Sequence, residues 1–426
     1  MTDTDVEVEL RDRLHRLAAH ARTEPTREGA TTRRPPRRRA PVAVAALVVA
    51  FAAIAAVLLL DGEGEEGSRV ATEGSTALPA PDTVAWPGVG DTWTALPAGP
   101  ADDGLFNVTV WTGAELLTWG GETVSETEWA DDGAAYDPTT GSWRPLAGSP
   151  LTARSEHVAV WTGAEMITCC GRAPEGPAAT AAAYDPEADD WRELAPPPFE
   201  AQYAAAVWTG SEMIVTGGIT DGGQGQAEGT WAYDPVADTW TGLAPAPAVI
   251  ERQADAAWTG DRMIVWPRTF TDAPPMVYDR EADEWAVLPD LPEELAVDIG
   301  SMVWTGTEVI VWGVAAARDS DAVGARLSLD DLQWRPLADD PLPPFDWWEG
   351  TPGSNSAVWT GEEIVVWTGA IGPDGVESET TVLAYDPDAD QWRELDKAPA
   401  GSFHPELLWT GVVVVVLTNP LLALDP

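Results

Sequence analysis

The stretch "HVAVWTGAEMITCCG", residues 157–171, contains two short apolar runs joined by a Trp-Thr-Gly turn and ends in two adjacent cysteines followed by glycine. Two apolar runs on either side of a Gly-containing turn are typical of a β-hairpin. The same turn occurs seven times, with its tryptophan at Trp111, Trp161, Trp208, Trp258, Trp304, Trp359 and Trp409. Successive copies lie about 50 residues apart, and a period of this length indicates a repeat architecture.

A second hairpin is expected later in each repeat. A Tyr-Asp-Pro sequence, or a close variant of it, follows a variable loop in five copies, at Tyr136, Tyr184, Tyr233, Tyr278 and Tyr385. The aspartate can accept hydrogen bonds from the backbone amides just ahead of it, and proline presets the turn. One repeat therefore comprises four short strands.

Both faces of each predicted sheet are expected to be buried. The pattern W-x-x-L occurs seven times, at Trp93, Trp143, Trp191, Trp240, Trp285, Trp334 and Trp392. Residues three apart on a strand face opposite sides of the sheet, so an apolar pair at this spacing predicts burial on both sides. Seven four-stranded sheets of this kind predict an all-β fold, a seven-bladed β-propeller over residues 91–426.

The two ends of the repeat region indicate how the ring closes. The last repeat ends at "LLALDP", residues 421–426, without a W-x-x-L of its own, whereas the copy at Trp93 precedes the first Trp-Thr-Gly turn. We therefore expect the N-terminal strand to close the last blade by supplying its fourth strand.

Glycine pairs stand after the predicted second strand at Gly120-Gly121 and Gly217-Gly218, and a Tyr-Asp pair and a tryptophan follow each. In these residues the chain resembles kelch-type, galactose-oxidase-like β-propellers. The resemblance covers residues 91–426 and implies the propeller fold. The glycine pattern is broken in repeats two and four, which have Cys170-Gly171 and Pro267-Arg268. Kelch-like propellers include both binding scaffolds and galactose-oxidase-type enzymes, so the resemblance does not by itself imply an activity.

A membrane span is predicted ahead of the propeller. Residues 41–60 contain no charged side chain. A helix of this length, at about 1.5 Å per residue, crosses about 30 Å of hydrocarbon, which predicts a single transmembrane helix. A secretory signal is the competing interpretation, but the apolar run is longer than is usual for one. Arginines in "RRPPRRR", residues 33–39, precede the span and acids follow it, which places the N-terminus in the cytoplasm and the propeller outside the cell. In this respect the chain is similar to membrane-anchored bacterial proteins.

Two further segments flank the predicted span. Residues 1–40 form a cytoplasmic stub, in which Leu10, Leu14 and Leu17 lie on one stripe of a short amphipathic helix that could bind a cytoplasmic partner or the inner leaflet. Residues 61–90 are rich in Gly, Glu, Ala, Pro and Ser and are predicted to form a flexible acidic linker.

The charge of the chain excludes one class of partner. The 426 residues include 24 basic and 70 acidic side chains, a formal net charge of −46. A field of this sign repels phosphate backbones, so we expect no nucleic-acid partner. The predicted partners are an extracellular protein or glycan for the propeller and the lipid bilayer for residues 41–60.

No set of catalytic or metal-binding residues is predicted. Copper oxidation of the galactose-oxidase type needs several histidine and tyrosine ligands, and the predicted propeller contains only His157 and His404. We therefore predict no catalytic residue, no metal site and no cofactor. In "RDSDAVG", residues 318–324, a calcium site is the alternative to solvated loop acids. Cys169 and Cys170 are the only cysteines, and buried thiols, a disulfide between neighbours and a bridge to another chain all remain open.

The predicted ligand-binding surface lies in loops that do not repeat. The loop "PPFDWWEG" contains Asp346, Trp347, Trp348 and Glu349. Flat aromatic faces beside carboxylates suit sugar rings, which makes these four residues the first candidates. The alternative is a loop that buries both tryptophans as a plug over the channel.

Arg154 and His157 form the one R-x-x-H sequence of the repeats, and they either join this surface or hydrogen-bond the backbone of their own loop. Together these residues favour a non-catalytic extracellular module that binds a protein or glycan ligand. The alternative is an anchored polysaccharide-acting enzyme of galactose-oxidase-like, lyase or hydrolase type, whose active site is assembled from distant loops.

Overall fold

The computed structural model describes residues 84–86, 88–90, 92–99, 108–121, 129–220, 225–227, 229–250, 254–267, 273–292, 295, 297–315, 324–338, 351–371, 377–396, 406–417 and 421–426. All of them belong to the second of two units into which the chain divides, residues 71–426. The predicted stub and membrane span, residues 1–60, and most of the predicted linker lie outside the described residues. Within the described part of the chain, no helix is long and apolar enough to span a bilayer.

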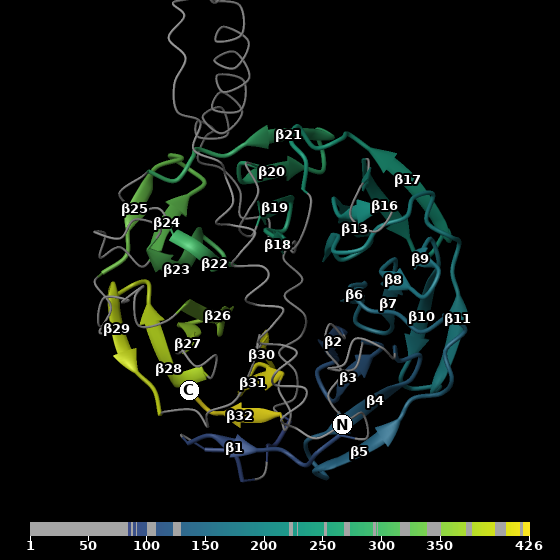
Figure 1. Cartoon of the computed structure of the whole chain (residues 1–426), viewed down its shortest axis with the longest axis horizontal. Coiled ribbons are helices and arrows are strands. Elements are labelled where there is room, and N and C mark those ends of the chain that lie inside the picture. The colour runs from purple at the N-terminus through teal and green to yellow at the C-terminus, as the bar shows by residue number, and fades with distance from the viewer. Residues whose placement is uncertain are drawn as a thin grey trace, which may run out of the picture. The chain divides into compact units, whose positions relative to one another are not determined.

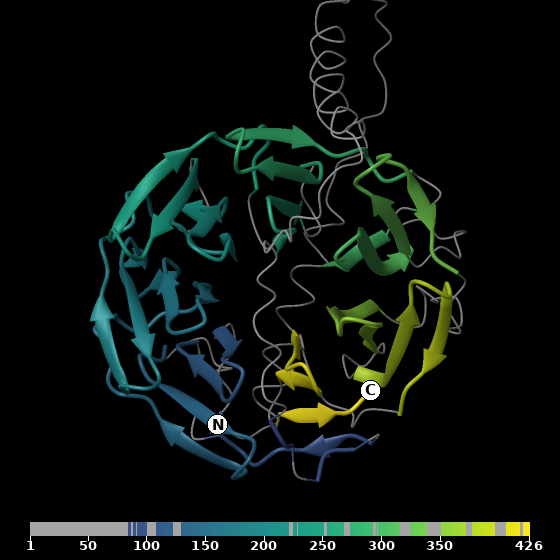
Figure 2. The same cartoon turned by 180° about the vertical axis from the view of Figure 1, so that it is seen from behind.

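The described chain folds as an all-β propeller of seven blades, as the sequence predicts. Each blade is an antiparallel sheet of four strands, and the blades follow one another in chain order around a ring (Figure 1, and from behind in Figure 2). The first strands of successive blades contact one another, from β2 (Val108–Trp111) to β30 (Glu406–Trp409), and these strands lie on the inner side of the ring.

The strand bounds follow the repeats of the sequence. Blades 1 to 4 consist of β2 (Val108–Trp111), β3 (Leu116–Trp119), β4 (Gly133–Asp137) and β5 (Ser142–Pro145); β6 (Val158–Trp161), β7 (Met166–Cys169), β10 (Ala181–Asp185) and β11 (Asp190–Glu193); β12 (Ala205–Trp208), β13 (Met213–Thr216), β16 (Thr230–Asp234) and β17 (Thr239–Leu243); and β18 (Ala254–Trp258), β19 (Arg262–Pro267), β20 (Met276–Asp279) and β21 (Glu284–Val287). Blades 5 to 7 consist of β22 (Val297–Trp304), β23 (Glu308–Ala315), β24 (Gly324–Ser328) and β25 (Trp334–Pro336); β26 (Thr351–Trp359), β27 (Ile364–Ile371), β28 (Glu377–Asp386) and β29 (Gln391–Glu394); and β30 (Glu406–Trp409), β31 (Val414–Leu417), β32 (Leu422–Leu424) and β1 (Thr94–Ala95).

Each blade is buried on both faces by its neighbours. In blade 2, Trp191 packs in an apolar cluster shared with blade 1, whereas Leu194, three residues later, packs in the cluster shared with blade 3. The spacing of W-x-x-L therefore places its two apolar side chains on opposite faces of the sheet, as strand alternation requires.

The N-terminal strand closes the ring, as predicted. β1 pairs antiparallel with β32, with Thr94 opposite Ala423 and Ala95 opposite Leu422. It forms the outer strand of blade 7, whose other three strands come from the C-terminal end of the chain. The N-terminal strand thus supplies the W-x-x-L that the last repeat lacks.

Packing of the chain begins before this strand. Trp86, which the sequence analysis placed in the linker, is buried, and its ring centroid lies 5.6 Å from that of Trp111 and 6.1 Å from that of Tyr136. It belongs to the apolar cluster that joins blade 7 to blade 1, so the packed propeller includes Trp86.

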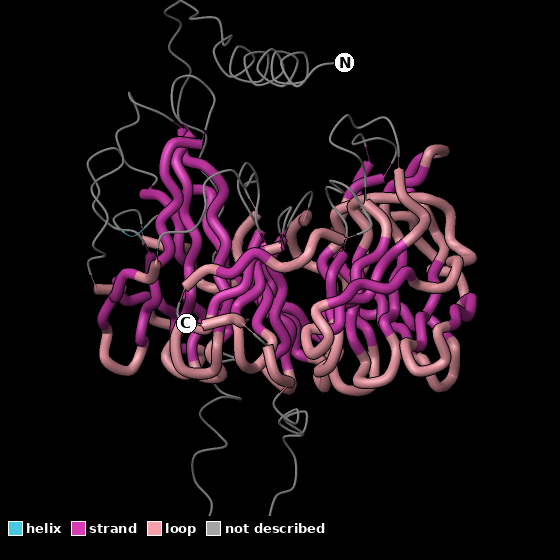
Figure 3. The backbone as a smooth tube through the Cα atoms, turned by 90° about the horizontal axis from the view of Figure 1, so that it is seen from below, coloured by secondary structure: helices cyan, strands magenta, loops and turns pink. Residues whose placement is uncertain are grey.

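The antiparallel order places the connections at two ends of the ring. The Trp-Thr-Gly and Tyr-Asp turns lie at one end, which we call the turn face, and the short turns line the lower edge of the side view in Figure 3. Connections from second to third strands and from blade to blade lie at the other end, which we call the loop face. There, the hairpins β8 (Arg172–Ala173) with β9 (Gly176–Pro177), and β14 (Ile219–Thr220) with β15 (Gly225–Gln226), extend blades 2 and 3.

Candidate functional site

Every blade is joined to the preceding one by a tryptophan hydrogen bond. The indole Nε1 of W-x-x-L donates to the backbone carbonyl of the residue that follows the leucine of the preceding W-x-x-L, at 2.7–2.9 Å. The pairs are Trp93 to Asp396, Trp143 to Pro97, Trp191 to Ala147, Trp240 to Ala195, Trp285 to Ala244, Trp334 to Pro289 and Trp392 to Ala338. Because Trp93 takes the place of blade 7's missing tryptophan, this series of bonds is complete around the ring.

A second repeated link uses an aspartate five residues after the tyrosine. In blade 3 the Tyr233 hydroxyl donates to Asp238 Oδ1 at 2.7 Å, and the same oxygen accepts the Ala195 N–H of the preceding blade at 2.8 Å. These two hydrogen bonds, led by that of the amide, lower the pKa of Asp238. Sequence reasoning missed this aspartate. The equivalent pairs are Tyr184 with Asp189, Tyr278 with Asp283 and Tyr385 with Asp390.

Glutamates four residues after the turn tryptophan are held by arginines at the turn face. Arg192 donates to Glu165 through Nε and Nη2, at 2.8 Å and 2.7 Å. The other pairs are Glu115 with Arg144, Glu212 with Arg280, Glu308 with Arg326 and Glu363 with Arg393. Repetition and pairing both identify these carboxylates as parts of the scaffold.

A shallow cavity of about 400 Å³ lies at the turn face between blades 1 and 2. Its lining includes Glu115, Trp161 and Glu187 together with small residues of the two kinds of turn. Glu115 is already held by Arg144 through two hydrogen bonds. Because most of the lining repeats around the ring, this cavity does not single out one blade junction as a site.

Arg154 is a buried cation behind the loop face. Its side chain is 1% exposed and makes four hydrogen bonds, all to neutral oxygens. Nη1 donates to the Cys170 carbonyl at 2.9 Å, Nη2 to Thr180 Oγ1 at 2.8 Å, and Nε to the Thr152 carbonyl at 3.0 Å. Burial lowers the pKa of Arg154. Two of these bonds go to backbone carbonyls, as one of the two sequence interpretations expects.

His157 is buried beside Arg154. Its ring meets that of Trp119 edge to face, with centroids 5.1 Å apart. Glycines make room for it, because a Cβ on Gly120 would lie 2.8 Å from His157 Cε1 and a Cβ on Gly171 would lie 2.6 Å from His157 Cβ. Burial, with the Arg154 charge second, lowers the pKa of His157 to about 3, so the ring is neutral at pH 7.

The two ring nitrogens of His157 have no hydrogen-bond partner of ordinary geometry among the described residues. The backbone of Trp119 is nevertheless close enough to favour the protonated form slightly. The structure thus brings Arg154 and His157 together beneath the loop face. That they join Asp346, Trp347, Trp348 and Glu349 in a ligand-binding surface stays a prediction, because those four lie outside the described residues.

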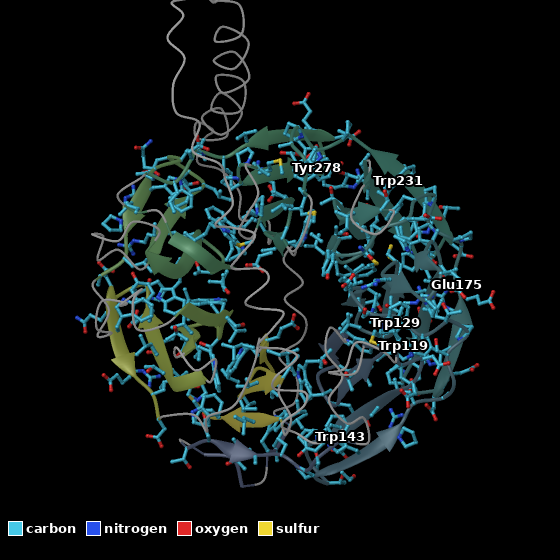
Figure 4. All side chains as sticks on the ribbon, in the orientation of Figure 1. Trp119, Trp129, Trp143, Glu175, Trp231 and Tyr278 are labelled. Carbon is cyan, nitrogen blue, oxygen red and sulfur yellow. The ribbon has the colours of Figure 1, made fainter. Side chains whose placement is uncertain are left out.

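A half-buried aromatic ring and an exposed cation form a pair at the loop face, over the same junction. The guanidinium carbon of Arg172 stands 5.3 Å from the ring centroid of Trp129, which comes from the connection between β3 and β4 of blade 1. Arg172 is exposed and Trp129 is half-buried. Figure 4 shows Trp129 among the side chains of blades 1 and 2.

Backbone hydrogen bonds hold both members of this pair against the loop that contains Arg154. The Arg154 N–H donates to the carbonyl of Ala130, next to Trp129, at 3.1 Å. Ser155 and Arg172 exchange two backbone hydrogen bonds, at 3.0 Å and 2.8 Å. Two loops of neighbouring blades are thus tied into one surface.

Sequence reasoning missed the Trp129–Arg172 pair, although one signal was available. Of the 23 tryptophans, those outside the repeated positions are Trp86, Trp129, Trp231, Trp347 and Trp348. A tryptophan in a loop without a repeat counterpart is free of the scaffold's requirements, which makes it a candidate for function.

Cys169 and Cys170 lie at the end of β7. Both side chains are buried in the apolar cluster between blades 2 and 3, and their Sγ atoms lie 2.8 Å apart. Cys170 has a φ of 68°, a conformation that costs a residue with a Cβ roughly 1–2 kcal/mol. Because both are buried, the folded protein presents neither sulfur to another chain.

Among the residues that the structure describes, no three His, Cys, Asp or Glu side chains gather closely enough to hold a metal ion. Apart from Gly324, the loop "RDSDAVG" of residues 318–324 lies outside them, so its calcium alternative stays untested.

Comparison of the sequence with models of known protein families finds no match. Comparison with curated proteins also finds none. The assignment of the propeller rests on its strand order and on the bonds between its blades.

Proposed function

We propose that this chain is a membrane-anchored propeller of the kelch type that serves as a non-catalytic binding or interaction module outside the cell. In this proposal a helix over residues 41–60 anchors it, and a glycan or protein ligand meets the loop face. The kelch assignment is supported by Gly120 of the glycine pair in blade 1, which leaves room for His157, and by the repeated Tyr-Asp and tryptophan links.

The Trp129–Arg172 pair carries this proposal. An indole beside an exposed guanidinium offers apolar surface and a fork of N–H donors at one place. That combination suits ligands with both apolar faces and hydroxyl or carboxylate oxygens, of which sugars are the clearest example. Because backbone hydrogen bonds hold both loops to the loop of Arg154, the two loops need little additional ordering when a ligand binds.

The difference between the two ends of the ring supports the same proposal. At the turn face, carboxylates repeat and are occupied by arginines, as in the Glu165–Arg192 pair. At the loop face, blades 1 to 3 differ in their connections, and the nonrepeating Trp129 and Arg172 lie there. Ligand-binding residues are found disproportionately on such variable loops over a rigid scaffold.

The test is a binding array of glycans and cell-wall fragments, using the full chain in a neutral detergent and analysing products for every hit. We expect binding without turnover, and Arg172→Gln should abolish it at unchanged melting temperature. Arg192→Gln is the matched control, because it removes an arginine of the turn face. Turnover of a hit would favour the anchored polysaccharide-acting enzyme instead, and equal loss in both variants would remove Arg172 from the site.

The loop that contains Trp347 and Trp348 needs a separate test. Trp347→Ala and Trp348→Ala, made singly, should weaken binding at unchanged thermal stability if the rings contact the ligand. A large loss of stability would identify the plug instead, because buried indoles contribute several kcal/mol to folding.

Topology is tested by adding protease to intact cells. The proposed anchor predicts that the propeller is removed while residues 1–40 stay protected. Protection of the propeller would contradict the proposed placement outside the cell, whatever the binding array shows.

A further inference from the structure

Blade 2 has cysteine where its neighbours have glycine. Cys170 has a φ of 68°, and the equivalent residues of blades 1 and 3, Gly120 and Gly217, both have a φ of 70°. The backbone at this corner requires a left-handed conformation, which glycine adopts without steric cost and cysteine does not. Cysteine at this corner therefore carries a steric cost that the glycines of blades 1 and 3 avoid, and its side chain is what distinguishes blade 2 here.

Both cysteines are buried in the apolar cluster between blades 2 and 3, but the large aromatic contact made at this corner in other blades comes from a different residue in blade 2. The position of Cys169 holds tryptophan in other blades, where for example Trp119 packs against Trp191 of the next blade at 5.6 Å between centroids. In blade 2, Phe199 takes that place, with its ring 5.5 Å from that of Trp240. The aromatic contact with the next blade is thus made by Phe199, and the two cysteines add only small side chains to the cluster.

The geometry brings the two sulfurs together. Consecutive side chains of a strand normally point to opposite faces, but the left-handed turn directs Cys170 into the same cluster as Cys169. Their Sγ atoms lie 2.8 Å apart, inside a site from which solvent is excluded. The strained residue and its sequence neighbour are therefore each other's partners.

We propose that Cys169 and Cys170 are joined by a disulfide. In the reaction the two thiols lose two protons and two electrons and form one S–S bond, while the S–S bond of an external disulfide, either a small one or that of an oxidoreductase, is reduced to two thiols. Compartments outside the cytoplasm supply such oxidants, and in this respect the inference rests on the proposed extracellular placement.

The bond forms before blade 3 packs against blade 2. In the folded chain both cysteines are buried, so an external disulfide does not reach either sulfur, and burial also raises the pKa of Cys170 well above its ordinary value. Once formed, the disulfide fixes the turn whose carbonyl accepts the Arg154 hydrogen bond at 2.9 Å. The modification therefore supports the loop that holds Trp129 and Arg172 in place.

The first test counts thiols. The full chain, purified without reductant from cells in which the propeller is exported, is unfolded in guanidinium with N-ethylmaleimide and weighed by mass spectrometry. Because the chain has only two cysteines, we expect no label before reduction and two labels after it, with the unreduced chain lighter by two hydrogen atoms. Two labels without reduction, or a covalent dimer, would overturn the proposal. A second sample, refolded with oxidised and reduced glutathione, separates the two causes of such a failure. If a disulfide forms in this sample, the proposed extracellular location is wrong; if none forms, the geometric argument is wrong.

The second test compares thermal unfolding with and without a phosphine reductant. The wild-type melting temperature should fall by about 1–2 °C when reductant is present, because the bond can break as the chain unfolds and it closes only a very short loop. Cys170→Gly, which restores the residue of blades 1 and 3, should melt at the same temperature in both conditions. The proposal fails if reductant leaves the wild type unchanged, or if it shifts Cys170→Gly equally.

Discussion

Two sets of polar contacts hold this ring, and they differ in how often they occur. The tryptophan-to-carbonyl bonds join every pair of neighbouring blades, at 2.7–2.9 Å. The set formed by Arg154, His157 and the Cys170 carbonyl occurs once, between blades 1 and 2. The repeated bonds make the blades equivalent, whereas the single set makes one junction unlike the others. Repetition therefore separates the scaffold from the place where a specific role is to be sought.

Removing the closing strand should have the largest effect on the repeated set. Deletion of residues 92–97 removes β1 and, with it, both the Trp93 donor and the Pro97 acceptor. We expect the free energy of unfolding to fall by more than about 4 kcal/mol, because the edge of β32 and the apolar junction between blades 7 and 1 are exposed together. Thermal denaturation with light scattering measures this. A monomer of unchanged melting temperature would show that the ring does not depend on β1.

Arg154→Met tests the set that occurs once. The substitution leaves the Cys170 carbonyl and the Thr180 hydroxyl without their donor, which should cost about 2–4 kcal/mol of folding free energy. Arg192→Met, at an exposed pair of the turn face, should cost about 0.5 kcal/mol. Guanidinium denaturation of both variants decides the matter, and equal losses would place Arg154 among ordinary surface arginines.

His157 should make the same junction sensitive to acid. Its pKa is lowered to about 3 in the folded protein, so below its ordinary value the unfolded chain binds a proton that the folded chain does not. The free energy of unfolding should therefore fall as the pH decreases from about 6.5, with a slope approaching about 1.4 kcal/mol per pH unit. His157→Gln should flatten the slope between pH 6.5 and pH 4.5, measured by denaturant titration at each pH. An unchanged slope would contradict the role assigned to burial.

The smallest effect is expected within the repeated set, from one hydroxyl. Tyr233→Phe removes the hydrogen bond to Asp238 and should cost about 1 kcal/mol, whereas Tyr136→Phe should cost less because Gly141 replaces the aspartate in blade 1. The pKa of Asp238 is lowered in the folded state, so its contribution is present above about pH 4 and lost as the pH falls further. Denaturation at pH 7 and pH 3 should show the two variants converging in acid; a constant difference would assign the effect to packing.

The number of blades and the closure of the ring were predictable because each rests on a burial pattern that repeats. The W-x-x-L pattern occurs seven times, and the copy at Trp93 lies far along the sequence from the other strands of blade 7. No comparable signal accompanied Trp86, because a single tryptophan among Pro, Gly and Ala has no period. Its burial depends on a junction between the first and last blades that only the folded ring creates.

The residues of the loop face were less predictable for a different reason. Trp129 and Arg172 come from loops of two blades, and their contact depends on backbone bonds through Ala130 and Ser155 that no spacing encodes. The left-handed conformation of Cys170 was also not predictable, because it is recognised only when the backbone of Cys170 is compared with that of Gly120. Contacts between loops that lack a sequence period can therefore be identified only in the folded structure.

The bond between Trp93 and Asp396 sets a limit on how this protein is made. Its partners lie 303 residues apart, a stretch that takes roughly 15–60 s to synthesise at ordinary rates. Blades 1 to 6 are each built from contiguous chain and need not wait, but β1 remains an unpaired edge with its tryptophan uncovered throughout that interval. Ring closure therefore has to wait until blade 7 has been synthesised, and a chain interrupted before that point would be an open arc whose two ends are ready to join other copies.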